Sequence, residues 1–418
     1  MNDFRYQSDE LYCESVPVKD IAKQVGTPFY LYSRHTLSHH YRVFDKAFAA
    51  VPHIICYSVK SNSNIAILRL FIKEGGGVDI VSGGELFRAV QAGVDPQKVV
   101  YSGVGKRMDE IEYALKTGIL MFNIESPQEL ELINQCAGQL NMKAGVALRI
   151  NPDVDAETHA YISTGKKENK FGIDVNRSLE AYKRAMSLKN IDIKGVSCHI
   201  GSQLTKVSPF INALNNLKKL IAMLETEKIH IRYLDLGGGL GITYNEETPP
   251  HPDAYAMAII EATHDLSCTF IFEPGRVIVG NAGILVTSVL YTKEGDAKNF
   301  FIVDAAMNDL IRPSLYQSYH HIQPVIIDKS RPDMVVDVVG PICESGDYLA
   351  KERRLQKFKQ GELMAVMSAG AYGFSMSSNY NSRPRIPEIM IDGEKIHVIR
   401  KRETFEDIIR GEVIPEDF

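Results

Sequence analysis

The sequence lacks several features that mark special classes of protein. Its 418 residues include 47 basic and 52 acidic side chains, a formal net charge of −5, whereas a nucleic-acid-binding surface usually shows a basic excess. No apolar run approaches the roughly 20 residues that cross a membrane. The first residues, MNDFRYQSDELY, contain no basic stretch followed by an apolar one, so we expect no secretory signal. We therefore expect a chain that binds neither nucleic acid nor membrane.

Cysteine is scarce, and its six copies are scattered along the chain. The sequence contains no CxxC pair and no Cys/His cluster at the spacing of a zinc site. The cysteines are Cys13, Cys56, Cys136, Cys198, Cys268 and Cys343. This pattern is typical of free thiols in a reducing compartment. We expect a cytoplasmic protein with no metal site and no disulfide.

The middle of the chain alternates short apolar runs with longer amphipathic ones. The strand-like runs cover residues 53–59, 77–82, 98–103, 119–125, 144–151, 193–201, 232–239 and 268–275. Helical segments separate most of these runs, and several of them end in Gly, as helices often do. Eight strands alternating with helices favour an α/β protein with a (β/α)8 barrel of the TIM type, with a doubly wound open sheet as the alternative.

After Gly275 the chain consists of short segments rich in β-branched residues. Asp392-Gly393 lies between two of these segments and predicts a hairpin. We expect a barrel over residues 34–275 and a mainly β domain over 276–418, which residues 1–33 join through the strand-like segment 27–33. A polar insertion at 152–176 interrupts the barrel pattern, and loops of that size are usually functional or disordered.

The ends of the predicted strands hold the side chains that could carry chemistry, because TIM-type barrels place their active sites there. Lys60 ends the first strand, and its amine is either a solvated rim lysine or a Schiff-base nucleophile whose pKa is lowered by burial. The glycine-rich segment 237–241 follows the seventh strand. It forms either a tight turn or a backbone cradle for an anion such as a phosphate, and its spacing does not fit a dinucleotide-binding fingerprint.

The loop after the eighth strand contains both Glu273 and Arg276. They form either a structural ion pair or a cofactor site, in which a buried carboxylate keeps a pyridine nitrogen protonated and the arginine binds a carboxylate in a fork. His199, at the end of the sixth strand, is either a core histidine or a ring stacked on a flat cofactor.

Three residues of the β domain stand in polar surroundings that a core strand would not have. Cys343 and Glu344 lie in PICESGDYLA, and Tyr372 lies in SAGAYGFSMSSNYNSRPR. A buried inert thiol is the usual role of a free cysteine, but the neighbours of Cys343 argue against it. Arg312, with Tyr316 four residues later, could face one carboxylate.

Six motifs occur together in a characteristic order. They are YSVKSN, HIGSQ, LDLGGGLGI, FEPGR, GPICESGD and GAYGFSMSSNYNSRPR. From about residue 10 to its end the chain resembles the fold-type III pyridoxal-phosphate decarboxylases, and among them the branch that acts on meso-2,6-diaminopimelate. The resemblance implies an alanine racemase-like fold, with pyridoxal 5'-phosphate bound in the barrel and the mainly β domain beside it.

The resemblance also implies a set of residues around the cofactor. Lys60 matches the lysine bonded to it, His199 the stacked ring, Glu273 the partner of the pyridine nitrogen and Asp79 an aspartate near the cofactor. The positions around the phosphate are Ser202, Gly238, Gly239, Gly275 and Arg276. Tyr372 matches a tyrosine that touches cofactor and substrate.

For the substrate, the resemblance implies that Arg276, Arg312 and Tyr316 hold its distal part, including the second carboxylate. Cys343 would be the proton donor and Glu344 would contact the substrate amino group, both supplied across the interface of a homodimer with composite active sites. The insertion from His159 to Gly172 would close over the site as a lid.

The implied reaction removes CO2 from the D-configured centre of meso-2,6-diaminopimelate and leaves L-lysine, the last step of lysine biosynthesis. Three alternatives remain at this point. A decarboxylase for ornithine, arginine or carboxynorspermidine would need an acidic distal pocket. An amino-acid racemase would use Cys343 as a second base. A non-catalytic pyridoxal-phosphate carrier would not need the β domain.

Overall fold

The computed structural model describes residues 2–154 and 170–417. The chain divides into two compact units. One, the β unit, comprises Met1–Leu37, Tyr244–Glu246 and Val279–Phe418; the other, the barrel unit, comprises Ser38–Thr243 and Glu247–Ile278. The two units are described separately below.

The barrel unit is built on eight parallel strands that close into a ring. They are β5 (His53–Ser58), β6 (Gly77–Ile80), β7 (Val99–Tyr101), β8 (Met121–Ile124), β9 (Ala144–Asn151), β11 (Ile191–Ser197), β12 (Tyr233–Asp235) and β13 (Thr269–Phe272). Each strand pairs with the next, and β13 pairs with β5 to close the ring. All eight predicted strands and the predicted (β/α)8 barrel are confirmed.

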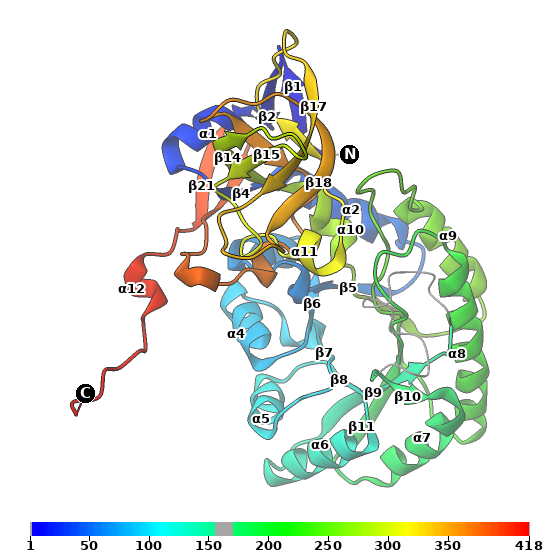
Figure 1. The fold of residues 1–418 in the computed structure, drawn as a ribbon. Helices are drawn as coiled ribbons and strands as arrows, with labels where there is room; N and C mark the ends of the chain where they lie inside the picture. The colour runs from blue at the N-terminus through cyan, green and yellow to red at the C-terminus, as the bar shows by residue number, and fades with distance from the viewer. Residues whose placement is uncertain (1, 155–169, 418) are drawn as a thin grey trace. The chain divides into compact units, whose positions relative to one another are not determined.

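Helices surround these strands on the outside (Figure 1). They are α2 (Arg34–Ala47), α3 (Ile65–Lys73), α4 (Gly83–Ala92), α5 (Met108–Thr117), α6 (Pro127–Gln139), α7 (Ser178–Ser187), α8 (Ser208–Thr226) and α9 (Pro252–Ala262). Their ends follow the sequence. The Ser82 and Ser126 hydroxyls accept the backbone N–H groups that begin α4 and α6, and left-handed Gly93 and Gly118 end α4 and α5.

The barrel interior changes character along its strands. Apolar side chains fill one layer; its buried members are Cys56, Val100, Leu120, Met121, Ala147 and Ile271. Toward the carboxyl ends of the strands the buried side chains become polar, with Asp79, Asn123 and Asp235 all fully enclosed. A filled barrel of this kind is a packed core and not a pore, so the polar layer makes this end of the barrel the candidate for a functional site.

The β unit contains the second large sheet. Its strand order is β18 (Tyr348–Gln356), β17 (Asp333–Val339), β15 (Phe300–Val303), β14 (Gly283–Lys293), β4 (Phe29–Ser33), β20 (Glu388–Asp392) and β21 (Lys395–Arg400). β19 (Leu363–Val366) pairs with β14 and with β16 (Ile322–Pro324). The position of β4 between β14 and β20 confirms that segment 27–33 belongs with this sheet, and the pairing of Asp392 with Lys395 confirms the predicted hairpin.

Several elements before and after the barrel strands were not predicted. The N-terminal residues form a small sheet of β1 (Phe4–Gln7), β2 (Glu10–Cys13) and β3 (Val16–Pro17), followed by α1 (Val18–Val25). Residues at the predicted start of the β domain are helical instead, in α10 (Arg276–Val279) and the turn that follows it. Short helices α11 (Arg312–Tyr316) and α12 (Phe405–Ile408) lie between or after the strands.

Two further expectations concern single segments. In the part of the chain that the structure describes, no helix combines the length and the apolar character needed to cross a membrane. The predicted lid at 159–172 lies mostly outside the described residues. The short strand β10 (Ile173–Asp174) pairs with β9 just beyond it.

Candidate active site

Lys60 lies at the mouth of the barrel beside a buried carboxylate. β5 ends at Ser58, two residues earlier than predicted, and Lys60 stands in the single helical turn Val59–Ser61 that follows. Its Nζ is 2.5 Å from Oδ2 of Asp79, on the neighbouring strand β6; the Lys60 side chain is 31% exposed and that of Asp79 0%. The Ser58 hydroxyl donates to the same Asp79 oxygen at 2.9 Å. Asp79 therefore holds the lysine amine at the rim, in reach of solvent.

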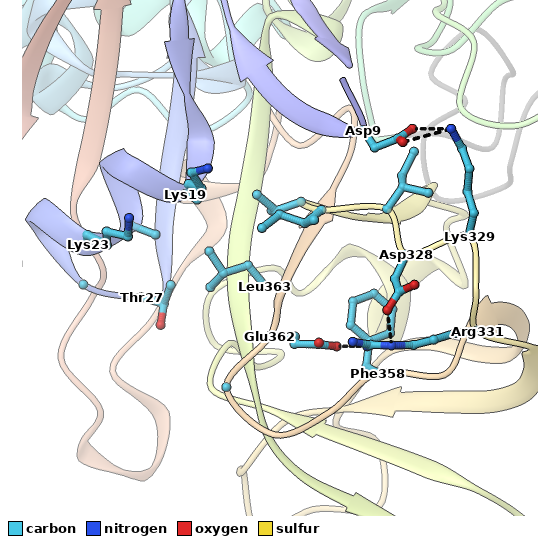
Figure 2. Close-up of a pocket in the computed structure, with 16 residues that line it drawn as sticks. Asp9, Lys19, Lys23, Thr27, Asp328, Lys329, Arg331, Phe358, Glu362 and Leu363 are labelled. Atoms are coloured by element: carbon cyan, nitrogen blue, oxygen red, sulfur yellow. Dashed lines mark hydrogen bonds and ion pairs between the residues drawn. The ribbon is translucent and has the colours of Figure 1, made fainter. Parts of the chain in front are cut away.

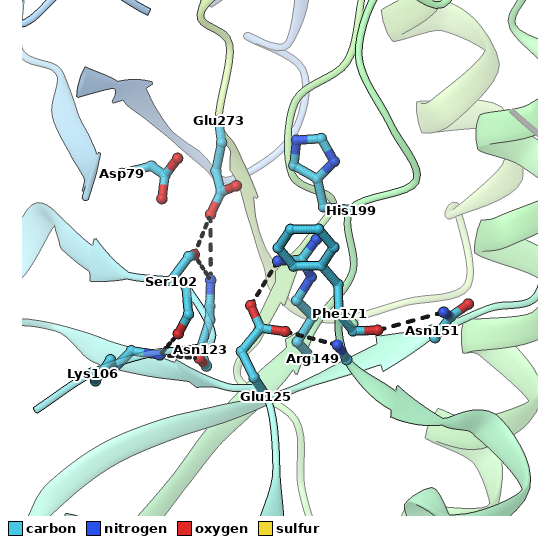
Figure 3. Close-up of polar contacts among 12 residues, drawn as sticks. Asp79, Ser102, Lys106, Asn123, Glu125, Arg149, Asn151, Phe171, His199 and Glu273 are labelled. Atoms are coloured by element: carbon cyan, nitrogen blue, oxygen red, sulfur yellow. Dashed lines mark hydrogen bonds and ion pairs between the residues drawn. The ribbon is translucent and has the colours of Figure 1, made fainter. Parts of the chain in front are cut away.

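A layer of buried polar side chains joins the ends of several strands, and Figure 3 shows Ser102, Asn123 and Glu273 of this layer linked by hydrogen bonds. The Asn123 amide donates to Asp235 Oδ2 at 2.8 Å and to Glu273 Oε1 at 3.3 Å. The Ser102 hydroxyl donates to the same Glu273 oxygen at 3.4 Å. Asp79 Oδ1 is buried and has no hydrogen-bond partner among the described residues. The layer thus presents carboxyl groups with hydrogen-bonding capacity left over.

Two carboxyl groups of this layer, Glu273 and Asp235, have raised pKa values. Burial raises the pKa of Glu273 well above its usual range, and the nearby charges of Asp235 and Asp79 raise it further. Burial also raises the pKa of Asp235. Perturbed carboxyls at one end of a barrel are a mark of a functional site.

The loops after β12 and β13 lie close together because the first of them contains glycine where they approach. The Gly237 amide donates to Asp235 Oδ1 at 2.9 Å, and the Glu273 amide donates back to the Gly237 carbonyl at 2.8 Å. A Cβ on Gly238 would stand 2.2 Å from the Glu273 carbonyl oxygen, far inside contact distance. Only glycine fits at position 238 with this backbone.

Arg276 and Ser202 bring two further loops to the same end of the barrel. The buried Arg276 guanidinium donates to the Ser202 hydroxyl, at 3.0 Å from Nη2 and 3.3 Å from Nε. Gly275 stands against Ser61 of the lysine turn, because a Cβ there would lie 3.0 Å from the Ser61 side chain. A guanidinium, a hydroxyl and glycine backbone together form a donor set suited to a phosphate.

His199 follows β11 and is half-buried. Its Nδ1 accepts the Gly201 amide at 3.2 Å. Burial lowers the pKa of the imidazole well below its usual value, and the cations Arg149 and Lys60 add to this effect. Arg149 itself donates to Glu125 at 2.7 Å, as Figure 3 shows. The ring is therefore neutral at physiological pH, as suits a stacking role.

Arg312 and Tyr316 lie in the β unit, at the two ends of α11. The buried Arg312 guanidinium donates to His320 Nε2 and to the Ser318 hydroxyl, both at 3.3 Å. It stands 5.0 Å from the ring centre of Tyr244 and 5.9 Å from that of Tyr316. Aromatic faces and neutral partners keep this cation charged and oriented.

Cys343 and Glu344 are exposed in the loop between β17 and β18 of the β unit. The Cys343 amide donates to the Asn381 side chain at 2.9 Å, which fixes the loop. Tyr372 follows β19, is half-buried, and has a φ of 55°. A non-glycine residue in this left-handed region is strained, and such strain is concentrated at functional sites.

The β unit also contains a pocket of about 850 Å³, drawn in Figure 2. None of the predicted site residues lines it. Its charged side chains are engaged in ion pairs: Lys329 pairs with Asp9, and Arg331 pairs with Asp328 and Glu362. Its other two cations, Lys19 and Lys23, pair with acids outside the lining. This pocket offers no convergent reactive groups, so the barrel end remains the candidate site.

Sequence reasoning missed several side chains of the barrel end. They are Ser58, Ser102, Asn123, Arg149 and Asp235. A signal for them existed, because each stands at or near the carboxyl end of a strand that was predicted correctly. Polar residues inside apolar strand runs, such as the Asn of MFNIE and the Arg of ALRIN, were the clue.

Comparisons with known proteins agree with the geometry. A family model described as the pyridoxal-binding domain of pyridoxal-dependent decarboxylases matches residues 34–280. A diaminopimelate decarboxylase of Vibrio cholerae is 52% identical over 421 residues, covering 100% of both chains. The structure of the Helicobacter pylori enzyme complexed with L-lysine is 43% identical, with a TM-score of 0.91 over 94% of this chain and 98% of that one. The M. jannaschii enzyme, also with L-lysine, is 37% identical, with a TM-score of 0.95 over 100% of both chains. This chain belongs to the diaminopimelate decarboxylase family of pyridoxal-dependent decarboxylases.

Proposed function

We propose that this chain decarboxylates meso-2,6-diaminopimelate at its D-configured centre and releases CO2 and L-lysine, with pyridoxal 5'-phosphate as cofactor. The observation that carries the reaction class is the Lys60 amine, held 2.5 Å from Asp79 at the mouth of the barrel whose interior buries Glu273. The near-full-length identity to diaminopimelate decarboxylases supports the substrate. The product suggests a role at the end of lysine biosynthesis.

The barrel residues fit the cofactor. The Lys60 amine suits its aldehyde, the buried Glu273 carboxyl suits a ring nitrogen, and the orphaned oxygen of Asp79 marks a polar position without a partner among the described residues. The residues that would hold it are Lys60, Asp79, His199, Ser202, Gly238, Gly239, Glu273, Gly275, Arg276 and Tyr372. When bound, pyridoxal phosphate supplies an electron sink for the electron pair left behind by CO2.

Each barrel residue has a separate task. Asp79 holds the lysine amine in place, and Glu273 would maintain a proton at the ring nitrogen of the bound cofactor. Arg276, with the Ser202 hydroxyl, would bind and neutralise its phosphate. His199 offers a neutral flat ring, because its pKa is lowered by burial. Together these residues orient one face of the reacting centre.

Selectivity is assigned to the distal end of the substrate. Arg276, Arg312 and Tyr316 are proposed to bind the second carboxylate, for which the planar guanidinium of Arg312 provides a bidentate fork. A site built for a buried carboxylate rejects an analogue without one, by up to about 10⁴-fold. Ornithine and arginine should therefore be poor substrates.

Cys343 and Glu344 are proposed to act in the site of a partner subunit, which makes the enzyme a homodimer with composite sites. Their exposure on a fixed loop supports this role. Cys343 would donate the proton to the carbon that loses CO2, and Glu344 would accept a hydrogen bond from the substrate ammonium. Mixing Lys60→Ala chains with Cys343→Ala chains tests the proposal. Heterodimers with one intact site should restore about a quarter of the activity, and no restoration would contradict composite sites.

The function itself is tested by supplying the purified chain with pyridoxal phosphate and meso-diaminopimelate. We expect CO2 and L-lysine in equal amounts, with little CO2 from ornithine or arginine and none from the Lys60→Ala variant. A change of stereochemistry without CO2 would identify a racemase instead. Release of CO2 chiefly from ornithine or arginine would identify the related decarboxylase.

We further propose a cytoplasmic location, which the six unpaired cysteines support. We also keep the proposed domain limits of 34–275 for the cofactor-binding barrel and 276–418, with 1–33, for the β domain. Expression of residues 34–275 alone, followed by cofactor titration, would test whether that segment binds pyridoxal phosphate by itself.

A further inference from the structure

We propose that Asp235 is a positioning residue that acts through Glu273. Before the cofactor binds, the two buried carboxyl groups share one proton, and Asp235 holds that proton on Glu273, ready for the ring nitrogen. This inference rests on the proposed function only in naming pyridoxal phosphate as the acceptor.

The geometry places Asp235 as the charged member of the pair. Its Oδ1 accepts the Gly237 amide at 2.9 Å and its Oδ2 accepts the Asn123 amide at 2.8 Å. Glu273 Oε1 accepts longer contacts, from the same Asn123 amide at 3.3 Å and from the Ser102 hydroxyl at 3.4 Å. The shorter hydrogen bonds stabilise the ionised form of Asp235. Glu273 is therefore assigned the proton that the two acids share.

The described residues provide no ion-pair partner for either acid. The Lys60 ammonium faces Glu273 but pairs with Asp79, and the Lys106 ammonium, which donates to the Asn123 carbonyl at 2.8 Å, pairs with Glu129. The titratable groups that face the pair are Asp79, Lys60, Cys56 and Cys198. Two of these are buried thiols, whose pKa is raised by burial. With no added positive charge, two touching carboxyls cannot both ionise, so one proton stays between them.

The proton transfer is balanced. When the cofactor binds, the O–H bond of Glu273 would break with its electron pair left on the carboxylate, and the proton would pass to the lone pair of the ring nitrogen. The total charge would be the same before and after, because the proton only moves from Glu273 to that nitrogen. Asp235 touches neither cofactor nor substrate in this scheme; it raises the proton affinity of Glu273.

The test is infrared titration of the full-length chain with its cofactor removed. We expect the C=O band of a protonated carboxyl, sensitive to deuterium exchange, at neutral pH. Asp235→Asn removes the neighbouring charge, so the pH at which the band vanishes should fall by about one unit or more. Glu273→Gln should remove one component of the band at neutral pH, seen in the difference spectrum between wild type and variant, because burial also raises the pKa of Glu85 and of Asp309 to about 7 and both contribute to the band. Asp253→Asn, at an acid whose side chain is 67% exposed, is the matched control and should leave the titration unchanged.

Two results would overturn the proposal. One is a cofactor-free wild-type chain without the band at neutral pH, a measurement that needs no variant to fold. The other is an unchanged midpoint in Asp235→Asn. If the band behaves as expected but the loaded chain releases no CO2 from diaminopimelate, then the proposed function fails and the shared proton stands.

Discussion

Gly238→Ala is the sharpest perturbation of the barrel end that the structure suggests. The new Cβ would lie 2.2 Å from the backbone oxygen of Glu273, although real Cβ atoms are almost never closer than 3.0 Å to another atom. The neighbour is backbone, not a flexible side chain. It cannot move freely, because the Glu273 amide is hydrogen-bonded to Gly237 at 2.8 Å. The loops after β12 and β13 must therefore separate by about 0.8 Å, the difference between those two distances.

Overpacking of this kind costs roughly 1–3 kcal/mol. The displaced residue, Glu273, is the one proposed to face the cofactor ring, so the cost should appear in cofactor affinity. At about 1.4 kcal/mol per factor of ten, we expect pyridoxal phosphate to bind roughly 5- to 150-fold more weakly. Fluorescence titration of the cofactor-free chain measures this affinity, and urea unfolding of the same sample measures the stability.

Gly84→Ala is the matched control. Gly84 lies in the first turn of α4, and its nearest atom to an added Cβ is the Ser82 hydroxyl at 3.8 Å. This variant should bind the cofactor as the wild type does and be slightly more stable, because alanine favours the helix. If Gly238→Ala showed the same cofactor affinity and the same stability as Gly84→Ala, the steric explanation would be wrong. The close approach of the two loops would then not be what requires glycine at position 238.

Three further outcomes are expected. Lys60→Ala should lose the visible absorption of the bound cofactor, and a chromophore that borohydride still traps on the protein would contradict the assignment. Arg312→Ala should raise KM and lower kcat/KM for diaminopimelate by 10-fold or more while cofactor absorption persists, since a charge-assisted hydrogen bond contributes about 1.5–3 kcal/mol. Steady-state kinetics, with Arg312→Lys measured for comparison, would detect this change. Unchanged kinetics would show that Arg312 does not bind the substrate. Burial raises the pKa of Glu85 from 4.5 to about 7, so its contribution to stability is present below pH 4.5 and is lost as the pH rises to about 7. Between pH 4.5 and 7, the free energy of unfolding of Glu85→Gln should therefore fall by up to about 3 kcal/mol less than that of the wild type. Denaturant unfolding at both pH values measures this difference, and an equal fall in the two proteins would contradict the raised pKa.

The barrel could be predicted because its strands are short apolar runs between amphipathic helices, and burial on both faces forces that pattern. The start of α4 at Ser82 and the hairpin at Asp392-Gly393 were encoded locally in the same way. Strand β18 was not. Its sequence, YLAKERRLQ, is strongly charged and has no strand-like alternation. It is a strand because β17 pairs with it along its length at the edge of the sheet, which a local pattern cannot reveal.

The active site could be predicted only in part, for a related reason. Lys60 and the glycine loop were identified from their positions after predicted strands. The hydrogen bond from Asn123 to Asp235 joins residues 112 positions apart. Nothing near either residue indicates that the two strand ends face one another inside a closed ring. Only the closure of β13 on β5, and the register that it imposes, brings the polar layer together.

That polar layer is difficult to explain by folding alone. Earlier along the same strands, residues such as Val100 and Ile271 fill the barrel with apolar side chains that need no partners. Asp79, Asp235 and Glu273 instead bury three carboxyl groups, of which only Asp79 forms an ion pair with a residue that the structure describes. Unpaired buried carboxyls destabilise a fold, and well-packed apolar replacements are often neutral or stabilising. A ligand that brings an aldehyde to Lys60 and a basic ring nitrogen to Glu273 would offset that cost, so this arrangement of acids is most simply understood as a binding site formed before its cofactor arrives.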